Sequence, residues 1–164
     1  MFADGDNFEK FFRDSAIPMH LIEEGLFLGS LDAAKDLNLL REHNITRVLS
    51  ILDTFRYFSP YDGIEQMRIE IADSPSARII DHVPMGLGFI SESQKSGKNI
   101  LVHCAAGVSR SASMVIAYIM VKYSLDFESA KSLVKSKRGC IWPNNGFQQQ
   151  ISSINIEAYR QYLK

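Results

Sequence analysis

A buried strand that leads through a short loop into a long helix is the clearest structural signal in this sequence. The run Asn99–His103 (NILVH) is apolar throughout, as in strands covered on both faces. Small residues follow it, and Arg110–Tyr123 then has the pattern of a helix. A strand, loop and helix in this order are typical of α/β proteins, in which strands and helices alternate around a parallel sheet.

The remainder of the chain repeats this alternation. Further strands are predicted at Gly25–Leu28, Arg47–Leu52 and Met67–Ile71. Helices are predicted at Leu31–His43, with Ser30 as N-cap, and at Asp81–Lys95, Asp126–Lys137 and about Gly146–Tyr162. We therefore expect an α/β fold with a central, mainly parallel, twisted sheet of four to five strands flanked by helices.

The length of 164 residues fits one domain, which we place at residues 18–164. Residues 1–17 form a separate N-terminal segment, predicted to be a short helix because Phe8, Phe11 and Phe12 fall at helical spacing before Pro18. The helix either packs on the body or forms a docking or dimer contact. A monomer or a weak dimer is the expected state.

The composition excludes several classes of protein. With 18 Lys+Arg against 19 Asp+Glu the net charge is -1, which argues against nucleic-acid binding. No apolar run approaches the roughly 20 residues that span a membrane, and the start lacks the pattern of a secretory leader. Two cysteines cannot form a disulfide scaffold. We expect free thiols and a location in the cytoplasm, with the nucleus as a second compartment.

The loop after the predicted strand has the features of a phosphate-binding nest. At a junction of strand and helix, free backbone N–H groups and the positive helix end favour an anion. The guanidinium of Arg110 can bind two phosphoryl oxygens at once. The loop residues expected to bind the substrate phosphate are Ala105, Ala106, Gly107, Val108, Ser109 and Arg110.

Cys104 stands at the floor of this nest, where the helix start and Arg110 favour its thiolate form. It is therefore the candidate nucleophile, and Ser111 can donate a hydrogen bond to its sulfur. The alternative is a plain core strand with Cys104 as a small buried hydrophobe, which the combination with Gly107 and Arg110 disfavours. The sequence has no Walker motif and no metal-ligand spacing, so no metal and no cofactor are expected.

The stretch HCAAGVSRSA resembles the H-C-x-x-G-x-x-R-[ST] loop of the cysteine-dependent protein tyrosine phosphatase superfamily, and most of all its dual-specificity branch. The segments LFLGSLDAA, ITRVLSILD, IEIADSPSA, VIAYIMVKYSLDFESA and WPNNGF resemble that branch in the same order, over about residues 17 to 163. The resemblance implies hydrolysis of phosphotyrosine, phosphoserine and phosphothreonine monoesters in proteins through a phosphocysteine intermediate. It matches the small type that lacks a docking domain.

The resemblance also assigns supporting residues. Asp73 matches the family's general acid. Asp53, which also follows a predicted strand, is the rival acid. His103 is expected to orient the loop and to favour the thiolate, although it could simply be a satisfied core histidine. Asn144 matches a position that buttresses the loop, with a helix N-cap as the equal alternative.

The loop contains no lysine, which favours phosphoprotein substrates over phosphoinositides, and MAP kinases are common targets of this branch. A phosphoresidue-binding pseudoenzyme is the second hypothesis, disfavoured because Cys104, Arg110, Ser111 and Asp73 are all present.

Two further features have open interpretations. A basic cluster near the C-terminal third either contacts an acidic phosphopeptide or forms a solvated helix face; it comprises Lys131, Lys135, Lys137 and Arg138. Cys140 is either an idle thiol or the partner of Cys104 in a protective disulfide.

Overall fold

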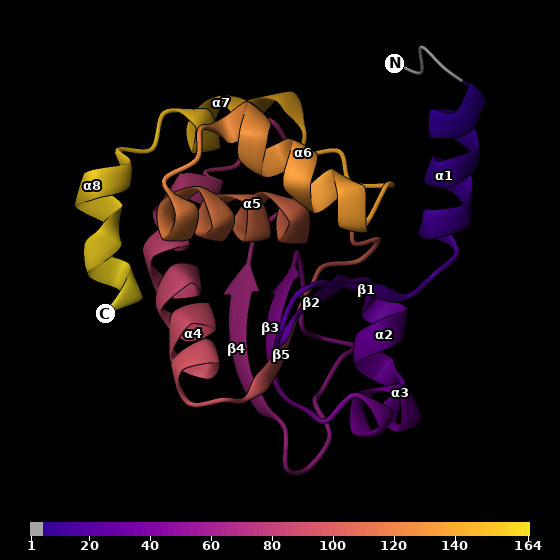
Figure 1. The fold of residues 1–164 in the computed structure, drawn as a ribbon. Coiled ribbons are helices and arrows are strands. Elements are labelled where there is room, and N and C mark those ends of the chain that lie inside the picture. Colours follow the sequence, from indigo (N-terminus) through magenta and orange to yellow (C-terminus); the bar gives the residue numbers. More distant parts are fainter. Residues whose placement is uncertain (1–4) are drawn as a thin grey trace.

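The computed structural model describes residues 5–164 and shows one sheet with helices on both faces (Figure 1). The strand order is β1-β2-β5-β3-β4, and only the β1–β2 pair is antiparallel. The strands are β1 (Met19–Glu23), β2 (Leu26–Gly29), β3 (Ile45–Leu52), β4 (Glu65–Glu70) and β5 (Asn99–His103). The predicted α/β class and mainly parallel sheet are confirmed.

Helices make up most of the remaining described chain. The α-helices are α1 (Gly5–Ser15), α2 (Leu31–Lys35), α3 (Leu37–Glu42), α4 (Val83–Lys95), α5 (Arg110–Tyr123), α6 (Phe127–Lys137), α7 (Asn145–Ser152) and α8 (Ile156–Tyr159). There are also two 3₁₀ turns: η1 (Ile79–His82) precedes α4, and η2 (Arg160–Leu163) follows α8. None of the helices in residues 5–164 has the length and apolar character needed to cross a bilayer.

The structure corrects the sequence-based prediction in three places. Strand β1 was missed; its five residues lie on the sheet edge and pair with β2 across a turn at Gly25, where φ is +81°. The predicted helix 31–43 is two helices, because the Asp36 side chain accepts a hydrogen bond from the Leu39 amide and starts α3. The predicted helix 146–162 is also divided, since Asn155 caps α8 in the same way through the Ala158 amide.

The N-terminal segment contains a helix at Gly5–Ser15, while residues 1–4 of the predicted segment lie outside the described chain. Figure 1 shows α1 at the side of the molecule, next to α6. The Lys10 ammonium donates to the carbonyl of Ser136 at 3.1 Å, and the Asp14 carboxylate accepts from the Gly139 amide at 2.6 Å. The helix thus packs on the end of α6 and the loop that follows it.

The core has two parts, one on each face of the sheet. The larger lies between the sheet and α4 to α7, and the smaller lies under α2 and α3. Helix α5 lies at the centre of the larger part, and its residues 110–121 are all buried. Gly86 of α4 faces the thioether of Met114, and a Cβ there would lie 2.3 Å from the sulfur, so close packing of α4 on α5 accounts for this glycine.

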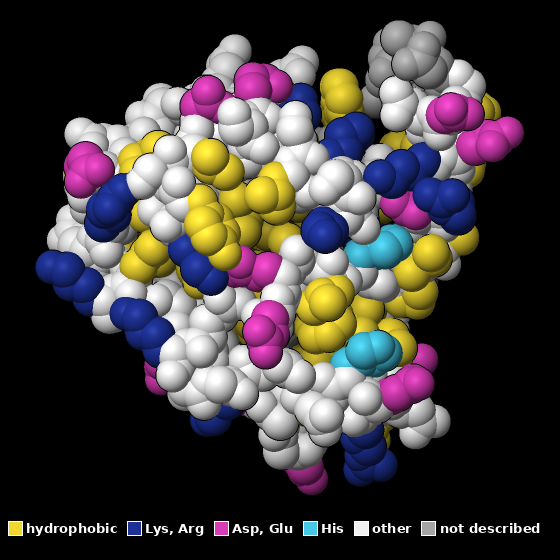
Figure 2. Space-filling view, viewed as in Figure 1, with side chains coloured by type: hydrophobic (Ala, Val, Ile, Leu, Met, Phe, Trp, Pro, Cys, Tyr) yellow, Lys and Arg dark blue, Asp and Glu magenta, His cyan; other side chains and the backbone are white. Residues whose placement is uncertain are grey.

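Apolar side chains also reach the surface beside the edge strand. Figure 2 shows hydrophobic side chains gathered near two histidines on the face that carries β1. A shallow groove on that side is lined by Ile17, Pro18, Met19, Leu21, Phe27, Leu39 and His43. The groove belongs to the edge of the sheet and lies apart from the loop after β5.

Candidate active site

Cys104 follows directly after β5, the central strand, at the carboxyl end of the sheet. Only 2% of the residue is exposed. Its Sγ lies 3.1 Å from Oγ of Ser111 and accepts a hydrogen bond of 3.3 Å from the amide of Gly107. Hydroxyl and amide donors at this distance stabilise a thiolate, which is the reactive form of cysteine. The predicted contact between Ser111 and the sulfur is therefore present.

The carbonyls of the loop all have hydrogen-bond donors outside it or in the next helix. Their donors, in order from Cys104 to Ser109, are His103 Nδ1, Leu31 N, Arg138 Nη2, Arg138 Nε, Trp142 N and Ser113 N. Because N–H and C=O of a trans peptide point in opposite directions, bound carbonyls fix where the amides point. The structure thus turns the amides of the loop toward its interior, as a phosphate nest requires.

Gly107 has a backbone conformation that favours glycine, and there is no room for a side chain at its position. Its φ is +69°, a conformation that favours glycine. A Cβ on Gly107 would lie 2.6 Å from the backbone of Gly29 and 2.8 Å from Nη2 of Arg138. Only glycine fits between strand β2 and this guanidinium.

Arg110 is the first residue of α5 and is 7% exposed. Its Nη1 donates to the carbonyl of Ile71 at 3.0 Å and lies 3.8 Å from Oδ1 of Asp53. Its Nε is buried and has no hydrogen-bond partner among the described residues. A buried guanidinium N–H next to a nest of amides matches the donor that an oxyanion ligand needs.

Both candidate acids lie at this loop, each through a different contact. Asp73 accepts a hydrogen bond of 2.9 Å from Nδ2 of Asn144. The backbone amide of Asn144 donates to Oγ of Ser109 at 2.9 Å. Asn144 also caps α7 by accepting from the Phe147 amide, so the two roles considered for it coexist. Asp53, which is 69% exposed, lies instead beside Arg110.

His103 is part of a buried chain of hydrogen bonds. Since a carbonyl only accepts, its Nδ1 donates to the Cys104 carbonyl, and its Nε2 must accept from the Ser50 hydroxyl at 2.6 Å. Gln66 donates to Ser50 at 2.8 Å. Burial, opposed by the hydrogen bond to Cys104 and assisted by Arg110, lowers the pKa of His103 to about 4. At neutral pH the imidazole is uncharged, so it orients the loop without adding positive charge.

The basic cluster does not form a single surface. Lys131 and Lys135 lie over the ring of Trp142, with Nζ at 4.9 and 5.4 Å from its centroid, and Lys137 is exposed. Arg138 is 0% exposed and binds loop carbonyls. For Arg138, both the solvated helix face and the contact with a phosphopeptide are therefore wrong, because its guanidinium faces the protein interior.

Cys140 is buried, and like Cys104 it is a free thiol. Burial raises the pKa of Cys140, with opposing effects of Arg138 and others too small to reverse it. A thiol of raised pKa is a weak nucleophile at neutral pH, which suits the idle role better than the redox role.

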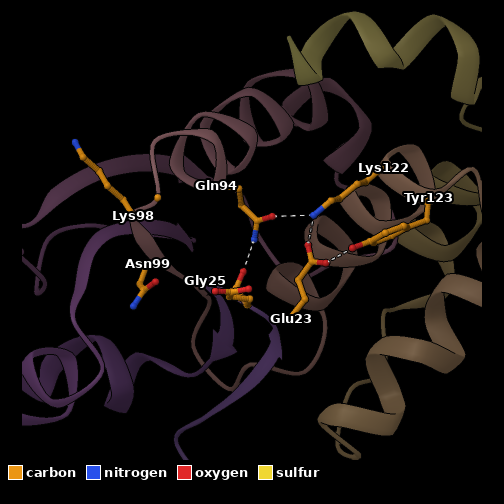
Figure 3. Close-up of a pocket in the computed structure, with 9 residues that line it drawn as sticks. Glu23, Gly25, Gln94, Lys98, Asn99, Lys122 and Tyr123 are labelled. Atoms are coloured by element: carbon orange, nitrogen blue, oxygen red, sulfur yellow. Dashed lines mark hydrogen bonds and ion pairs between the residues drawn. The ribbon is translucent and has the colours of Figure 1, made fainter.

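A second hollow lies at the opposite end of the sheet, near the start of β5 (Figure 3). There Lys122 donates to Glu23 at 2.8 Å and to Gln94 at 2.9 Å, and the Tyr123 hydroxyl also donates to Glu23. The polar side chains at the centre of this hollow bind one another, and no cysteine lines it. Across residues 5–164 there is also no cluster of three His, Cys, Asp or Glu side chains that could hold a metal.

Sequence reasoning missed the contribution of Arg138, Trp142 and Leu31 to the loop. Two of these donate through backbone amides, which leave no mark in the sequence. Arg138 lies in a run of basic residues, and residue type alone does not separate it from exposed neighbours such as Lys137.

Comparison with known proteins agrees with this geometry. Residues 26–157 match the family described as dual specificity phosphatase, catalytic domain. Human dual specificity protein phosphatase 22 is 38% identical over 149 residues, covering 89% of this chain and 80% of that protein. The crystal structure of DUSP15 is similar with a TM-score of 0.83 at 33% identity, covering 89% of this chain and 94% of the other. Human tyrosine phosphatase-like serine/threonine/tyrosine-interacting protein gives a TM-score of 0.79 at 36% identity, with coverage of 90% and 99%.

Proposed function

This chain belongs to the dual specificity phosphatase family, and we propose from its geometry which residues perform each step of the reaction. The protein is a dual specificity protein phosphatase that removes phosphate from phosphotyrosine and from phosphoserine or phosphothreonine in proteins. The observation that supports the assignment most strongly is the position of Cys104, whose sulfur is bound by Ser111 and Gly107 under a loop with outward carbonyls.

In the first step the Cys104 thiolate attacks phosphorus and the bond to the seryl, threonyl or tyrosyl oxygen breaks. The loop amides and the guanidinium of Arg110 stabilise the negative charge on the phosphoryl oxygens in the transition state. Asp73, protonated at this stage, gives its proton to the leaving oxygen. The products are a phosphocysteine and the free hydroxyl of the substrate protein.

In the second step water attacks the phosphorus of the phosphocysteine. Asp73, now a carboxylate, takes a proton from that water, and the sulfur leaves as a thiolate. Ser111 stabilises this thiolate because its hydroxyl can donate to the sulfur at 3.1 Å. Inorganic phosphate is released, and Asp73 is protonated again for the next turnover.

A phosphoresidue-binding protein is the second candidate. One similar structure is described as a phosphatase-like interacting protein, so the fold alone does not separate the two functions. The side chains favour the enzyme, since Cys104 and Ser111 are in contact and Arg110 begins α5 at the end of the same loop.

The substrate class follows from the loop composition. The residues between Cys104 and Arg110 carry no charge, which fits a phosphoprotein and leaves recognition to surfaces outside the loop. MAP kinases are the partner class we propose, on the strength of the family resemblance. Substrate trapping from a native lysate with Asp73→Ala tests this, because that variant keeps the nucleophile and the phosphate nest while turnover is slowed.

Replacing the nucleophile tests the function itself. Cys104→Ser should abolish hydrolysis of p-nitrophenyl phosphate while a phosphotyrosine peptide still binds, because the amides and Arg110 are unchanged. Cys140→Ala is the matched control, and it should retain turnover. Undiminished turnover by Cys104→Ser would refute the assignment, and a wild-type protein that binds the peptide without turnover would establish the binding protein instead.

A further inference from the structure

The guanidinium of Arg138 joins the phosphate-binding loop to the chain that precedes β1. Its Nε donates to the Gly107 carbonyl at 3.0 Å and its Nη2 to the Ala106 carbonyl at 3.3 Å. On the other side, Nη1 donates to the Ile17 carbonyl at 2.8 Å and to Nδ1 of His20 at 2.9 Å. Arg138 thus uses all three nitrogens, and two of them hold the loop.

Burial makes these contacts hard to replace. The exposed fraction of Arg138 is 0% and Gly107 is buried, so water cannot replace the donor to the Gly107 carbonyl without a structural change, whereas Ala106 is exposed and its carbonyl is only partly shielded. Each buried carbonyl left without a donor costs about 1–3 kcal/mol. The carbonyls of residues 105, 108 and 109 are bound by backbone amides and that of Cys104 by the His103 ring, whereas the carbonyls of Ala106 and Gly107 both depend on one side chain. The middle of the loop is therefore the part most sensitive to one substitution.

The end of α1 completes the surroundings of this guanidinium. Asp14 is 4% exposed, and its carboxylate accepts from the Gly139 amide at 2.6 Å. Burial opposes its ionisation, yet the hydrogen bonds from the Gly139 amide and from Arg13 lower the pKa of Asp14, so it is charged at neutral pH. His20 accepts from Arg138 through Nδ1, so its proton is on Nε2, 3.7 Å from Asp14. Nη1 of Arg138 also donates to the backbone carbonyl of Asp14 at 3.5 Å. The Asp14 carboxylate itself reaches the guanidinium only through its neighbours, His20 and the Gly139 amide.

We propose that Arg138 is a positioning residue for catalysis, which fixes the amide of Gly107 toward the Cys104 sulfur by holding the outward carbonyls, and that Asp14 in α1 secures Arg138 in that position. The inference rests on the proposed function and deepens it. It also gives the N-terminal helix, which lies outside the residues matched by the family, a role in the reaction rather than in packing alone.

The test compares Arg138→Met with Arg41→Met, an exposed arginine at the end of α3. Both are assayed well below their melting temperatures with p-nitrophenyl phosphate as substrate and inorganic phosphate as competitive inhibitor. Arg138→Met should lower kcat/KM by about 100-fold, as expected for a misplaced catalytic group, and should raise the phosphate inhibition constant at least about tenfold. Arg138→Lys should restore only part of the kcat/KM and phosphate binding that Arg138→Met loses, because one ammonium cannot hold both carbonyls as a guanidinium does.

The link to α1 is tested by Asp14→Asn, with Asp6→Asn in the same helix as control. Asp14→Asn should change the same two constants in the same direction by about threefold to tenfold, and it keeps the proposal testable if Arg138→Met does not fold. Because the two residues act as a unit, its effect should be smaller in an Arg138→Lys background.

A lower melting temperature with both constants within twofold of wild type would overturn the positioning role of Arg138. Fully additive effects of Asp14→Asn and Arg138→Lys would overturn the role of α1. Neither result affects the proposed function, which depends separately on the loss of turnover in Cys104→Ser.

Discussion

Asn144 donates its side-chain amide to the Asp73 carboxylate at 2.9 Å while its own backbone amide is bound to the phosphate-binding loop. One residue therefore fixes the separation between the candidate acid and the loop that holds the phosphate. It does so from the N-cap of α7, where its side-chain oxygen accepts from the Phe147 amide. The position of the acid is thereby tied to the start of a helix 71 residues further along the chain.

Two substitutions separate these roles of Asn144. Asn144→Asp keeps an acceptor for the helix cap but replaces the donor to Asp73 with a second carboxylate that repels it, so kcat/KM for a phosphotyrosine peptide should fall about tenfold while the cap is retained. Asn144→Ala should lose the same activity and also about 1 kcal/mol of stability. Urea unfolding and peptide dephosphorylation measure the two effects. Equal activity of Asn144→Asp and wild type would show that the contact does not position the acid.

The general acid can be identified by its dependence on the leaving group. Asp73→Ala should slow a phosphotyrosine peptide more than p-nitrophenyl phosphate, whose leaving group needs little protonation. Asp53→Ala should lower neither rate selectively, because the carboxylate lies beside Arg110 and is 69% exposed. If the leaving-group dependence appears in Asp53→Ala and is absent from Asp73→Ala, the assignment of the acid is reversed.

Gly146 constrains the loop that carries Asp73. A Cβ at this position would lie 1.9 Å from the carbonyl oxygen of Pro75, which is backbone and cannot rotate away. Gly146→Ala should therefore displace the loop by about 1 Å and lower kcat/KM for a phosphopeptide by about tenfold or more.

The matched control for Gly146 is Gly88→Ala in α4, where the nearest atom, the Tyr162 carbonyl oxygen, is 3.6 Å away. This substitution should leave activity unchanged and add up to about 1 kcal/mol of stability through helix propensity. Full activity in Gly146→Ala would mean that the Pro75 backbone moves without disturbing the acid.

His103 predicts a specific pH dependence of stability. Its pKa is about 4 in the folded protein, where burial opposes the charged form, against an ordinary value of 6.5. Between these values the unfolded chain binds a proton that the folded chain does not, so stability falls as pH decreases from 6.5 toward 4. The full loss is about 3 kcal/mol. Urea unfolding at several pH values should show a weaker dependence in His103→Gln. An unchanged dependence would contradict the assignment.

The sequence predicted the features that depend on local pattern. The strand and helix on either side of Cys104, the small loop residues and Arg110 follow from residue type and spacing, and the family resemblance added Asp73 and Asn144. Strand β1 could not be predicted in this way, because a short edge strand such as Met19–Glu23 is defined by its pairing with β2 rather than by its own periodicity.

Contacts between segments far apart in the chain could not be predicted from the sequence either. The burial of Arg138 depends on α1 and the loop meeting at the same point, and the donation by the Trp142 amide depends on the path of the chain after α6. The break between α2 and α3 at Asp36 could not be predicted even though it depends on a local contact. Asp36 has the side chain of a good N-cap, but a continuous helix was also compatible with the apolar spacing around it.

The distribution of donors around the loop has a kinetic consequence. Its carbonyls are bound from residue 31 on one side and from residues 138 and 142 on the other, so the loop reaches its final shape only after separate parts of the chain have come together. Such non-local contacts form later than helices during folding. On refolding from urea, helical circular dichroism should therefore recover before enzymatic activity, and activity reports completion of the whole fold.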